Sequence, residues 1–253
     1  MYKLTEGEII TYIIYETKGR AREYCELAAN LYRGCSHGCV YCYAPSATYR
    51  TRENFSHSSV REDVISKFEK DAILLEKQGE ERPILLSFTT DPYQQLDVEK
   101  ELTRQAIKIL HDHGLKVRIL TKGGKRSERD FDLLAANPEL SEYGATLVFT
   151  NEAMRLKIEP YAASTNERIE SLKNAHVLGI KTFVSLEPVW EPTQTLELID
   201  LTYEYVDTYK VGKLNYHPKQ KETNWNMFTK DVSSRLQSYN KDYYLKKELR
   251  VLV

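Results

Sequence analysis

Short apolar runs alternate with longer amphipathic segments along most of the chain. The apolar runs have the length of buried strands and lie at 24–31, 83–88, 116–121, 145–150, 181–186 and 209–214. Segments with helical periodicity follow them, at 60–78, 99–113, 128–136, 166–178, 196–205 and 225–236. Val64, Phe68, Ala72 and Leu75, for example, recur every three or four residues, as on one face of a helix. Strands that alternate with helices in this way predict βαβ units and a parallel sheet.

About six such units fit the chain, which is too few for a closed eight-stranded barrel. We therefore predict an α/β fold with an open, partial (β/α)6 barrel of the TIM type. No internal repeat, low-complexity tract or linker interrupts the sequence, so residues 1–253 are expected to form one domain. Its core is expected at about 24–238, with the two terminal segments packed on it as additions.

Capping residues mark the expected helix ends. Gly179 is expected to terminate the helix at 166–178, and Thr165 or Asn166 to cap its start. Thr223 or Asn224 is the expected N-cap of the last helix.

The composition indicates a globular protein with no membrane span. The mean hydropathy is -0.54, and the longest apolar runs, 84–88 and 182–186, are far too short to cross a bilayer. The N-terminal string M-Y-K-L-T-E-G-E lacks the apolar core of a signal peptide, so we expect a cytoplasmic protein. The net charge of -1 argues against binding to nucleic acid through bulk positive charge, although a local basic groove is compatible with it.

Polar residues follow the predicted strands at the ends where α/β enzymes place their chemistry. They are Thr90 and Asp91 after the second strand, Thr121 and Lys122 after the third, Thr150 and Asn151 after the fourth, Glu187 after the fifth and Asn215 after the sixth.

Three of the four cysteines, Cys35, Cys39 and Cys42, form a C-x3-C-x2-C pattern in N-L-Y-R-G-C-S-H-G-C-V-Y-C-Y-A-P at 30–45. In a reducing compartment, clustered cysteines indicate metal or redox chemistry rather than disulfides. A structural zinc site would need Cys25 or His37 as a fourth ligand, and neither gives a paired spacing. A redox pair would leave Cys35 without a role. Three thiolates suit a [4Fe–4S] cluster in which one iron is open to a small molecule.

The string C-S-H-G-C-V-Y-C resembles the cluster motif of radical SAM enzymes, including the aromatic residue before the last cysteine. Further strings resemble the branch that contains spore photoproduct lyase: T-T-D-P-Y-Q at 89–94, L-T-K at 120–122, E-P and N-E-R within 159–168, and V-G-K-L-N-Y at 211–216. The resemblance implies a partial (β/α)6 barrel that binds S-adenosylmethionine at the open iron. It also implies an external one-electron reductant of the flavodoxin or ferredoxin type, and a 5′-deoxyadenosyl radical that abstracts hydrogen from the substrate.

The resemblance assigns roles to the residues of the cysteine loop. Cys35, Cys39 and Cys42 would be the cluster ligands, and Tyr41 and Tyr43 would lie beside the cofactor.

Further side chains are implied at the S-adenosylmethionine site: Thr90, Asp91, Lys122, Thr150, Asn151 and Arg168. Asp91 would meet the methionine ammonium, although Asp91-Pro92 is also a turn signal. Lys122 would meet the cofactor carboxylate and take part in catalysis. Arg168 would contact the cofactor or form a structural ion pair with Glu159.

Two features depart from the spore photoproduct lyase pattern. The lyase uses a further cysteine downstream of the cluster as a hydrogen donor, and this chain has none after Cys42, so dimer repair by that route is not expected. Glu187, in S-L-E-P-V-W, stands where the lyase has a small residue. A carboxylate there is predicted to bind substrate or to act as acid or base, or else to pair with Lys122 or Arg168.

Basic residues at 122–129 and 213–221 are expected at the rim of the site, near Tyr93, Trp190, Tyr216 and His217. They would either grip phosphates and stack bases or form a solvated rim. The leading hypothesis is hydrogen abstraction from a nucleobase or nucleotide in DNA or RNA, with isomerase or lyase chemistry. The alternatives are an amino acid, a peptide or another metabolite as substrate, and a non-catalytic iron–sulfur or zinc module.

Overall fold

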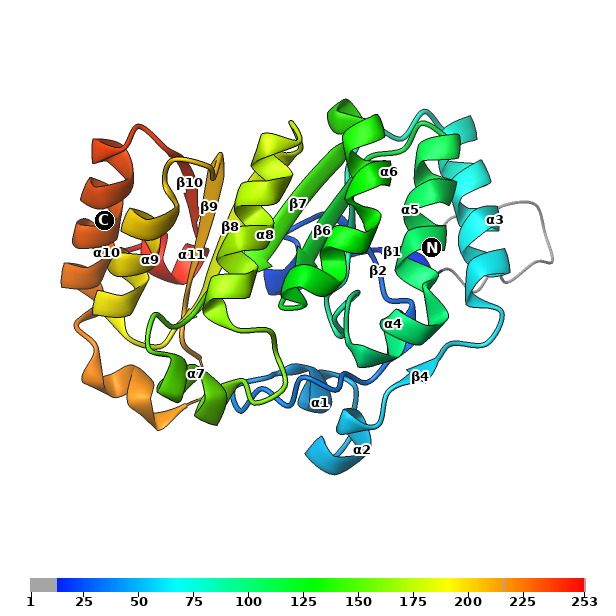
Figure 1. Ribbon diagram of the computed structural model, residues 1–253. Helices are drawn as coiled ribbons and strands as arrows, with labels where there is room; N and C mark the ends of the chain where they lie inside the picture. The colour runs from blue at the N-terminus through cyan, green and yellow to red at the C-terminus, as the bar shows by residue number, and fades with distance from the viewer. Residues whose placement is uncertain (1–12, 216, 253) are drawn as a thin grey trace.

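A computed structural model describes residues 13–215 and 217–252, so the N-terminal string at 1–8 and Tyr216 lie outside the described residues. An eight-stranded sheet of order β1-β2-β5-β6-β7-β8-β9-β10 forms its centre (Figure 1). The strands are β1 Ile14–Glu16, β2 Leu27–Ala29, β5 Ile84–Leu86, β6 Val117–Thr121, β7 Ser141–Thr146, β8 Lys181–Val189, β9 Thr208–Lys213 and β10 Asp242–Leu245. β1 is antiparallel to β2, and the neighbouring pairs from β2–β5 to β9–β10 are parallel. The sheet is open, with β1 and β10 as its edges.

Helices follow the strands and cover the outer face of the sheet, with α3, α5, α6 and α8 in front of it in Figure 1. The helices are α1 Ala44–Ala47, α2 Arg52–Ser56, α3 Val64–Lys77, α4 Gln95–Lys100, α5 Leu102–Asp112, α6 Phe131–Ala136, α7 Glu152–Ile158, α8 Thr165–Val177, α9 Pro192–Thr202, α10 Trp225–Ser238 and α11 Lys247–Arg250. The six parallel strands from β2 to β9 confirm the predicted partial barrel. Within the described residues, no helix is long and apolar enough to cross a membrane.

Two helices differ from their predicted extents because single residues adopt left-handed backbone conformations. The segment at 99–113 is divided at Glu101 (φ 50°), so α4 and α5 replace one helix. The segment at 60–78 begins only at Val64, since Asp63 has φ 49° and Ser59–Val60 forms β4, paired with β3 (Tyr32–Arg33). The amphipathic pattern continues across both breaks and therefore does not reveal them.

The N-cap of α8 is Ser164, and not Thr165 or Asn166. Its hydroxyl accepts from the Glu167 backbone N–H while the Glu167 side chain accepts from the Ser164 N–H, which completes a capping box. Asn224 caps α10, one of the two predicted choices.

The fourth parallel strand lies earlier than predicted, at Ser141–Thr146 rather than 145–150. A Cβ on Gly144 would lie 2.5 Å from the Phe183 ring, so this strand contains a glycine in place of an apolar side chain, just before the predicted range. The terminal segments also differ from the prediction, because they contribute β1 and β10 to the sheet itself.

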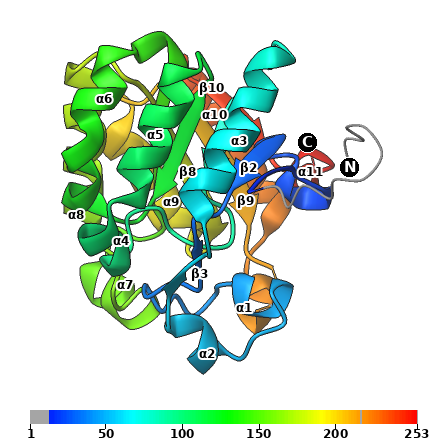
Figure 2. The ribbon, with the colours of Figure 1, turned by 90° about the vertical axis from the view of Figure 1, so that its right-hand side faces the viewer.

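Alternate residues of each inner strand face different surroundings. On β8, Val184 and Leu186 join the large core beneath the helices. Phe183 points the other way, into a small cluster with Tyr24 inside the barrel. Because strand side chains alternate, Ser185 and Glu187 continue this inward row. The row leads to the edge of the sheet where α1, α2 and α7 gather, at the bottom of Figure 1 and again in Figure 2.

Candidate active site

The cysteine loop is held in a tight path by two glycines. Gly34 (φ 78°) passes so close to α2 that a Cβ would lie 2.5 Å from the Phe55 carbonyl oxygen. Gly38 (φ 66°) passes against Pro160 and Tyr161, between α7 and α8. The Val40 N–H donates to the Ile158 carbonyl at 2.9 Å. The loop therefore spans the edge of the barrel from the β3 side to the end of α7.

Three free thiols lie in this loop, on the half-buried residues Cys35, Cys39 and Cys42. Burial raises the pKa of the Cys35 thiol and takes that of Cys39 to about 12, and the neighbouring thiols add to both shifts. Three thiolates in this place therefore need a cation to balance them. Among the described residues, no three His, Cys, Asp or Glu side chains meet closely enough to hold one metal ion. A cluster, which offers each thiolate a separate iron, does not require such a meeting.

Neither candidate for a fourth ligand faces the three thiols. Cys25 precedes β2, and its sulfur lies 3.1 Å from the Pro83 carbonyl at the opposite end of the sheet. His37 is 3% exposed and is engaged by the protein, with its Nδ1 3.4 Å from an Asp91 oxygen and its Nε2 3.1 Å from Arg126. Burial lowers the pKa of His37 to about 4, so the ring is neutral at neutral pH.

Asp91 joins three separate segments. One carboxylate oxygen accepts from the Tyr93 N–H at 2.9 Å and from the Thr121 hydroxyl at 2.6 Å, and the other accepts from the Lys122 N–H at 2.7 Å. Burial alone would raise the pKa of Asp91, but His37 and these bonds hold it below its usual value. Both oxygens are thus engaged by the protein. The bond to Tyr93 has the geometry of the turn that was the alternative for this residue.

The segment after β5 also holds the start of the cysteine loop. The Thr90 hydroxyl donates to the Gly34 carbonyl at 2.6 Å, and the Ser36 N–H donates to Gln94 at 3.1 Å. Gln94 is fully buried, and its amide also donates to the Thr90 hydroxyl at 2.9 Å. Gln94 was not singled out from the sequence, although it ends the string T-T-D-P-Y-Q.

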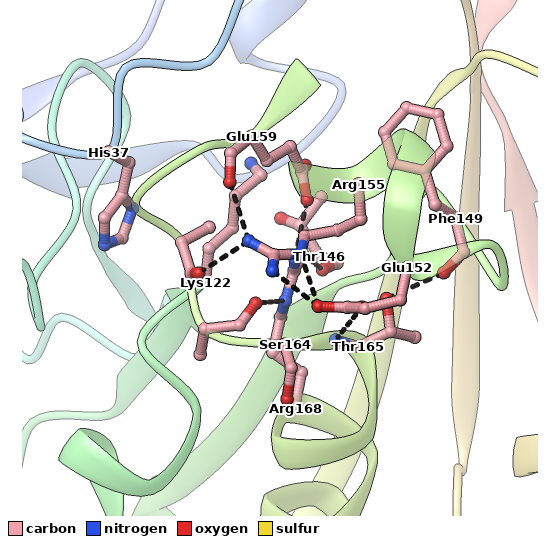
Figure 3. A network of polar contacts seen from close by, with 12 residues as sticks. His37, Lys122, Thr146, Phe149, Glu152, Arg155, Glu159, Ser164, Thr165 and Arg168 are labelled. Carbon is pink, nitrogen blue, oxygen red and sulfur yellow. Dashed lines mark hydrogen bonds and ion pairs between the residues drawn. The ribbon is translucent and has the colours of Figure 1, made fainter. Parts of the chain in front are cut away.

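A buried polar network ties the loop to α7 and α8 (Figure 3). Arg168 donates to Glu159 at 2.6 Å, and the two side chains are 1% and 0% exposed. The other Glu159 oxygen accepts from the Tyr41 hydroxyl. Arg155, which sequence reasoning missed, donates to the carbonyls of Glu159 and Ala162 at 3.0 and 3.1 Å. The geometry is that of the structural ion pair, the second of the two alternatives for Arg168.

Lys122 is pinned by its backbone and projects an ammonium toward the cysteine loop (Figure 3). Its carbonyl accepts from the Ala163 N–H at 3.0 Å, and its Nζ lies 5.6 Å from the centre of the Tyr41 ring. Burial opposes its charge, but Cys39, Glu159 and Asp91 together raise the pKa of Lys122. In the described part of the chain, the ammonium has no carboxylate within ion-pair distance, so it remains a cation available to a ligand.

Thr150 and Asn151 are engaged at the start of α7. The Thr150 hydroxyl donates to Glu197 at 2.6 Å, and the backbone N–H groups of both residues donate to Gln194 at 2.9 Å. The Asn151 side chain caps α7 through the Met154 N–H at 3.0 Å. These bonds join α7 to α9.

Tyr43 and Arg52 lie at the outer side of the loop. Tyr43 is 53% exposed, and its hydroxyl donates to the Phe88 carbonyl at 3.2 Å. The exposed Arg52 donates to the carbonyls of Cys39 and Cys42 at 3.3 and 3.4 Å. A cationic side chain thus borders the thiols on the solvent side.

Glu187 pairs with neither Lys122 nor Arg168, the two partners considered for it. Its carboxylate accepts from Lys246, beyond the end of β10, at 2.7 Å. It lies over Gly212 of β9, where a Cβ would be 2.6 Å from the carboxyl carbon. Glu187 therefore faces the barrel interior, as the alternation along β8 indicates.

Much of the expected basic rim is paired within the protein. Arg126 donates to the Tyr93 carbonyl, and Arg129 pairs with Asp97 and Asp130, at 2.8 to 2.9 Å. On the opposite side, Lys219 pairs with Glu191 at 2.6 Å. The ring centres of Trp190 and His217 lie 4.8 Å apart, and the two rings form an aromatic wall at this edge.

A family model described as the Radical SAM superfamily matches residues 29–206, which is more than half of the chain. The chain belongs to the radical SAM superfamily. It is 28% identical over 176 residues to an uncharacterized protein of Methanocaldococcus jannaschii, covering 69% of this chain and 62% of that one. It is 26% identical over 203 residues to an uncharacterized protein of Acidianus two-tailed virus, covering 74% and 64%. The chain thus spans less than two thirds of the length of these relatives.

Solved radical SAM structures share the fold at low sequence identity. Spore photoproduct lyase complexed with dinucleoside spore photoproduct superposes with a TM-score of 0.71 at 14% identity, covering 94% of this chain and 81% of that chain. Streptococcus suis SuiB bound to S-adenosylmethionine gives 0.65 at 13% identity, covering 86% and 49%. Radical SAM proteins use a [4Fe–4S] cluster and S-adenosylmethionine, and the three-thiol loop beside an unpaired ammonium suits both groups.

Because Cys25 lies at the far end of the sheet, we expect the Cys25→Ser variant of this radical SAM protein to bind a full cluster. The serine hydroxyl keeps a donor for the Pro83 carbonyl, so the fold should be retained. Iron and sulfide content and the absorbance near 400 nm after anaerobic reconstitution measure the cluster. Loss of the cluster in this variant would show that the ligand assignment is wrong.

Proposed function

We propose that this protein abstracts a hydrogen atom from a nucleobase or nucleotide held inside the partial barrel, in an isomerase-type or lyase-type reaction. Cys35, Cys39 and Cys42 would hold the cluster, and Lys122 would bind the carboxylate of S-adenosylmethionine. The observation that carries the proposal is that this three-thiol loop covers the barrel edge at which the Lys122 ammonium approaches Tyr41 of the loop and Glu187 faces the interior. When bound, the two cofactors supply the one-electron chemistry that makes hydrogen abstraction possible.

The chain's own groups bind and orient the cofactors. Thr90 and Gln94 fix the start of the cysteine loop, so that its thiols are held over the barrel. The Glu159–Arg168 pair fixes its middle through Tyr41. Such positioning is the main contribution that a protein makes to cofactor chemistry. The exposed side, beside Arg52, is where we place the approach of the external one-electron reductant.

Similarity to a lyase solved with a dinucleoside spore photoproduct supports a nucleobase substrate. An amino acid, a peptide or another metabolite is the second candidate. Label transfer separates them. With deuterated thymidine, or an oligonucleotide that contains it, we expect deuterium in the 5′-deoxyadenosine that the reduced enzyme forms. Transfer from deuterated amino acids or peptides, and none from nucleosides or oligonucleotides, would contradict the proposal.

Replacing Lys122 with methionine is expected to weaken binding of S-adenosylmethionine by about 10- to 100-fold, since a hydrogen bond to a charged group contributes about 1.5–3 kcal/mol. Cluster content should not change. Binding to the anaerobic holoprotein measures the effect by titration calorimetry. Lys125→Met, which changes an exposed lysine three residues further along the chain, is the control and should bind as the wild type does. Equal affinities of the two variants would rule out this role for Lys122.

A further inference from the structure

Inside the barrel, Glu187 and Lys246 form an ion pair that the cofactors do not explain. The Lys246 ammonium donates to one Glu187 oxygen at 2.7 Å, and the side chains are 15% and 26% exposed for lysine and glutamate. Glu187 lies on β8 and Lys246 follows β10, so the pair spans the intervening strand β9. The missing side chain of Gly212 makes room for the carboxylate, since a Cβ there would lie 2.6 Å from its carbon.

Tyr24 packs beside this pair and presents a hydroxyl that lacks a partner. Its ring centre is 5.4 Å from the Lys246 Nζ, and the residue is 4% exposed. The hydroxyl makes no hydrogen bond among the described residues, although Ser185 is nearby. Burial raises the pKa of Tyr24, and Glu187 is near enough to raise it further. A buried donor without an acceptor is costly, so an acceptor on a ligand bound beside the pair would satisfy this hydroxyl.

Lys210 adds a further donor on the same side of the sheet. Its ammonium lies 4.4 Å from the Tyr24 ring centre and donates to the Tyr24 carbonyl. Burial, with Arg118 nearby, lowers the pKa of Lys210 to about 8. The interior beside Glu187 thus holds one carboxylate acceptor and several donors.

We propose that Glu187 and Lys246 together bind the adjacent N–H and C=O of a cyclic amide on the substrate, as the edge of a thymine or uracil base presents them. Glu187 accepts the N–H, and Lys246 donates to the carbonyl oxygen. That oxygen has two lone pairs, so it also accepts a second donor, the role that the Tyr24 hydroxyl fits. The inference rests on the proposed nucleobase substrate and narrows it.

The interior beside Glu187 offers more hydrogen-bond donors than acceptors, and this favours an amide edge over other classes of ligand. A ring nitrogen, as in cytosine, offers one lone pair and leaves the second donor unpaired. A phosphate gives Glu187 no hydrogen to accept. A zwitterionic amino acid would have to separate the existing ion pair to bind both of its charges. A neutral amide edge adds to the pair without separating it.

The test uses the full-length, anaerobically reconstituted protein with S-adenosylmethionine, and thymidine, 3-methylthymidine and cytidine as probes for ligand-observed NMR titration. Thymidine should bind, and the other two should bind at least about tenfold more weakly, because each lacks the N–H beside a carbonyl. Equal binding of the three nucleosides, or no binding of any, overturns the inference.

Three variants assign the effect to the pair. Lys246→Met and Glu187→Met each remove one partner, and Gly212→Ala keeps both charges but pushes the carboxylate aside. Each should weaken thymidine binding about tenfold, whereas Lys247→Met, an exposed neighbour on α11, should not. Unchanged thymidine affinity in Lys246→Met and Gly212→Ala overturns the inference even if deuterium transfer from thymidine occurs. If thymidine binds selectively and these variants lose that binding, but no deuterium is transferred from thymidine, the result supports this inference and contradicts the proposed function.

Discussion

Replacement of Cys39 by alanine is expected to abolish formation of 5′-deoxyadenosine. Only two of the three loop thiols then remain, and neither Cys25 nor His37 is placed to substitute for the third. Because loss of an outer hydrogen-bond partner of a metal ligand already costs about 10- to 100-fold, we expect loss of a ligand to cost more than about 100-fold. Iron content and product, quantified by mass spectrometry after reduction with dithionite, provide the measurement.

The control for this experiment is Cys25→Ser, which removes a thiol without removing a proposed ligand. It should keep the activity of the wild type. A Cys39→Ala protein that retains four irons and forms product would contradict the ligand assignment, as would a Cys25→Ser protein that loses both.

Replacement of Arg168 by methionine is expected to destabilise the fold by about 3–5 kcal/mol, since removal of one partner leaves a buried charge uncompensated. Burial alone would raise the pKa of Glu159, but Arg168, Lys122 and the Tyr41 hydroxyl hold it below its usual value. Without the guanidinium of Arg168, the buried Glu159 carboxylate loses its ion-pair partner and keeps the weaker interactions with Lys122 and the Tyr41 hydroxyl. The free energy of unfolding in urea measures the effect.

Two further variants show whether the loss comes from the unpaired charge. Adding Glu159→Gln to Arg168→Met removes that charge and should recover part of the stability. Arg235→Met breaks the surface pair with Asp200, and should cost less than about 1 kcal/mol. If Arg168→Met costs no more than Arg235→Met, the buried pair does not stabilise this region.

The order of the strands and helices could be predicted, because the buried face of each element produces a local periodic pattern of apolar residues. The breaks within the predicted helices leave no such pattern in the sequence. Glu101 and Asp63 turn the chain by a single left-handed residue, and the amphipathic pattern on either side hardly changes. The place of Gly144 within a strand could not be predicted either, since the need for a glycine there arises from the Phe183 ring on another strand.

The site was predictable where the chemistry is local and not where it depends on distant partners. The spacing of the three cysteines already indicates a cluster with an open iron. Asp91-Pro92 signals the turn to Tyr93, but nothing local indicates that the oxygens of Asp91 also accept from Thr121 and the Lys122 backbone.

The partner of Glu187 was missed for the same reason. Lys246 lies 59 residues further along the chain, in a terminal segment expected to be an addition to the core. Only the pairing of β10 with β9 brings it into the barrel.

The central claim is that three loop thiolates leave one iron of the cluster for S-adenosylmethionine. The most direct measurement is electron–nuclear double resonance on the reduced holoprotein with S-adenosylmethionine labelled with ¹⁷O in its carboxylate and ¹⁵N in its amino group. We predict hyperfine coupling from both labels to the cluster, with the carboxylate coupling altered in Lys122→Met. A reduced four-iron cluster that shows no coupling to either label would contradict the account.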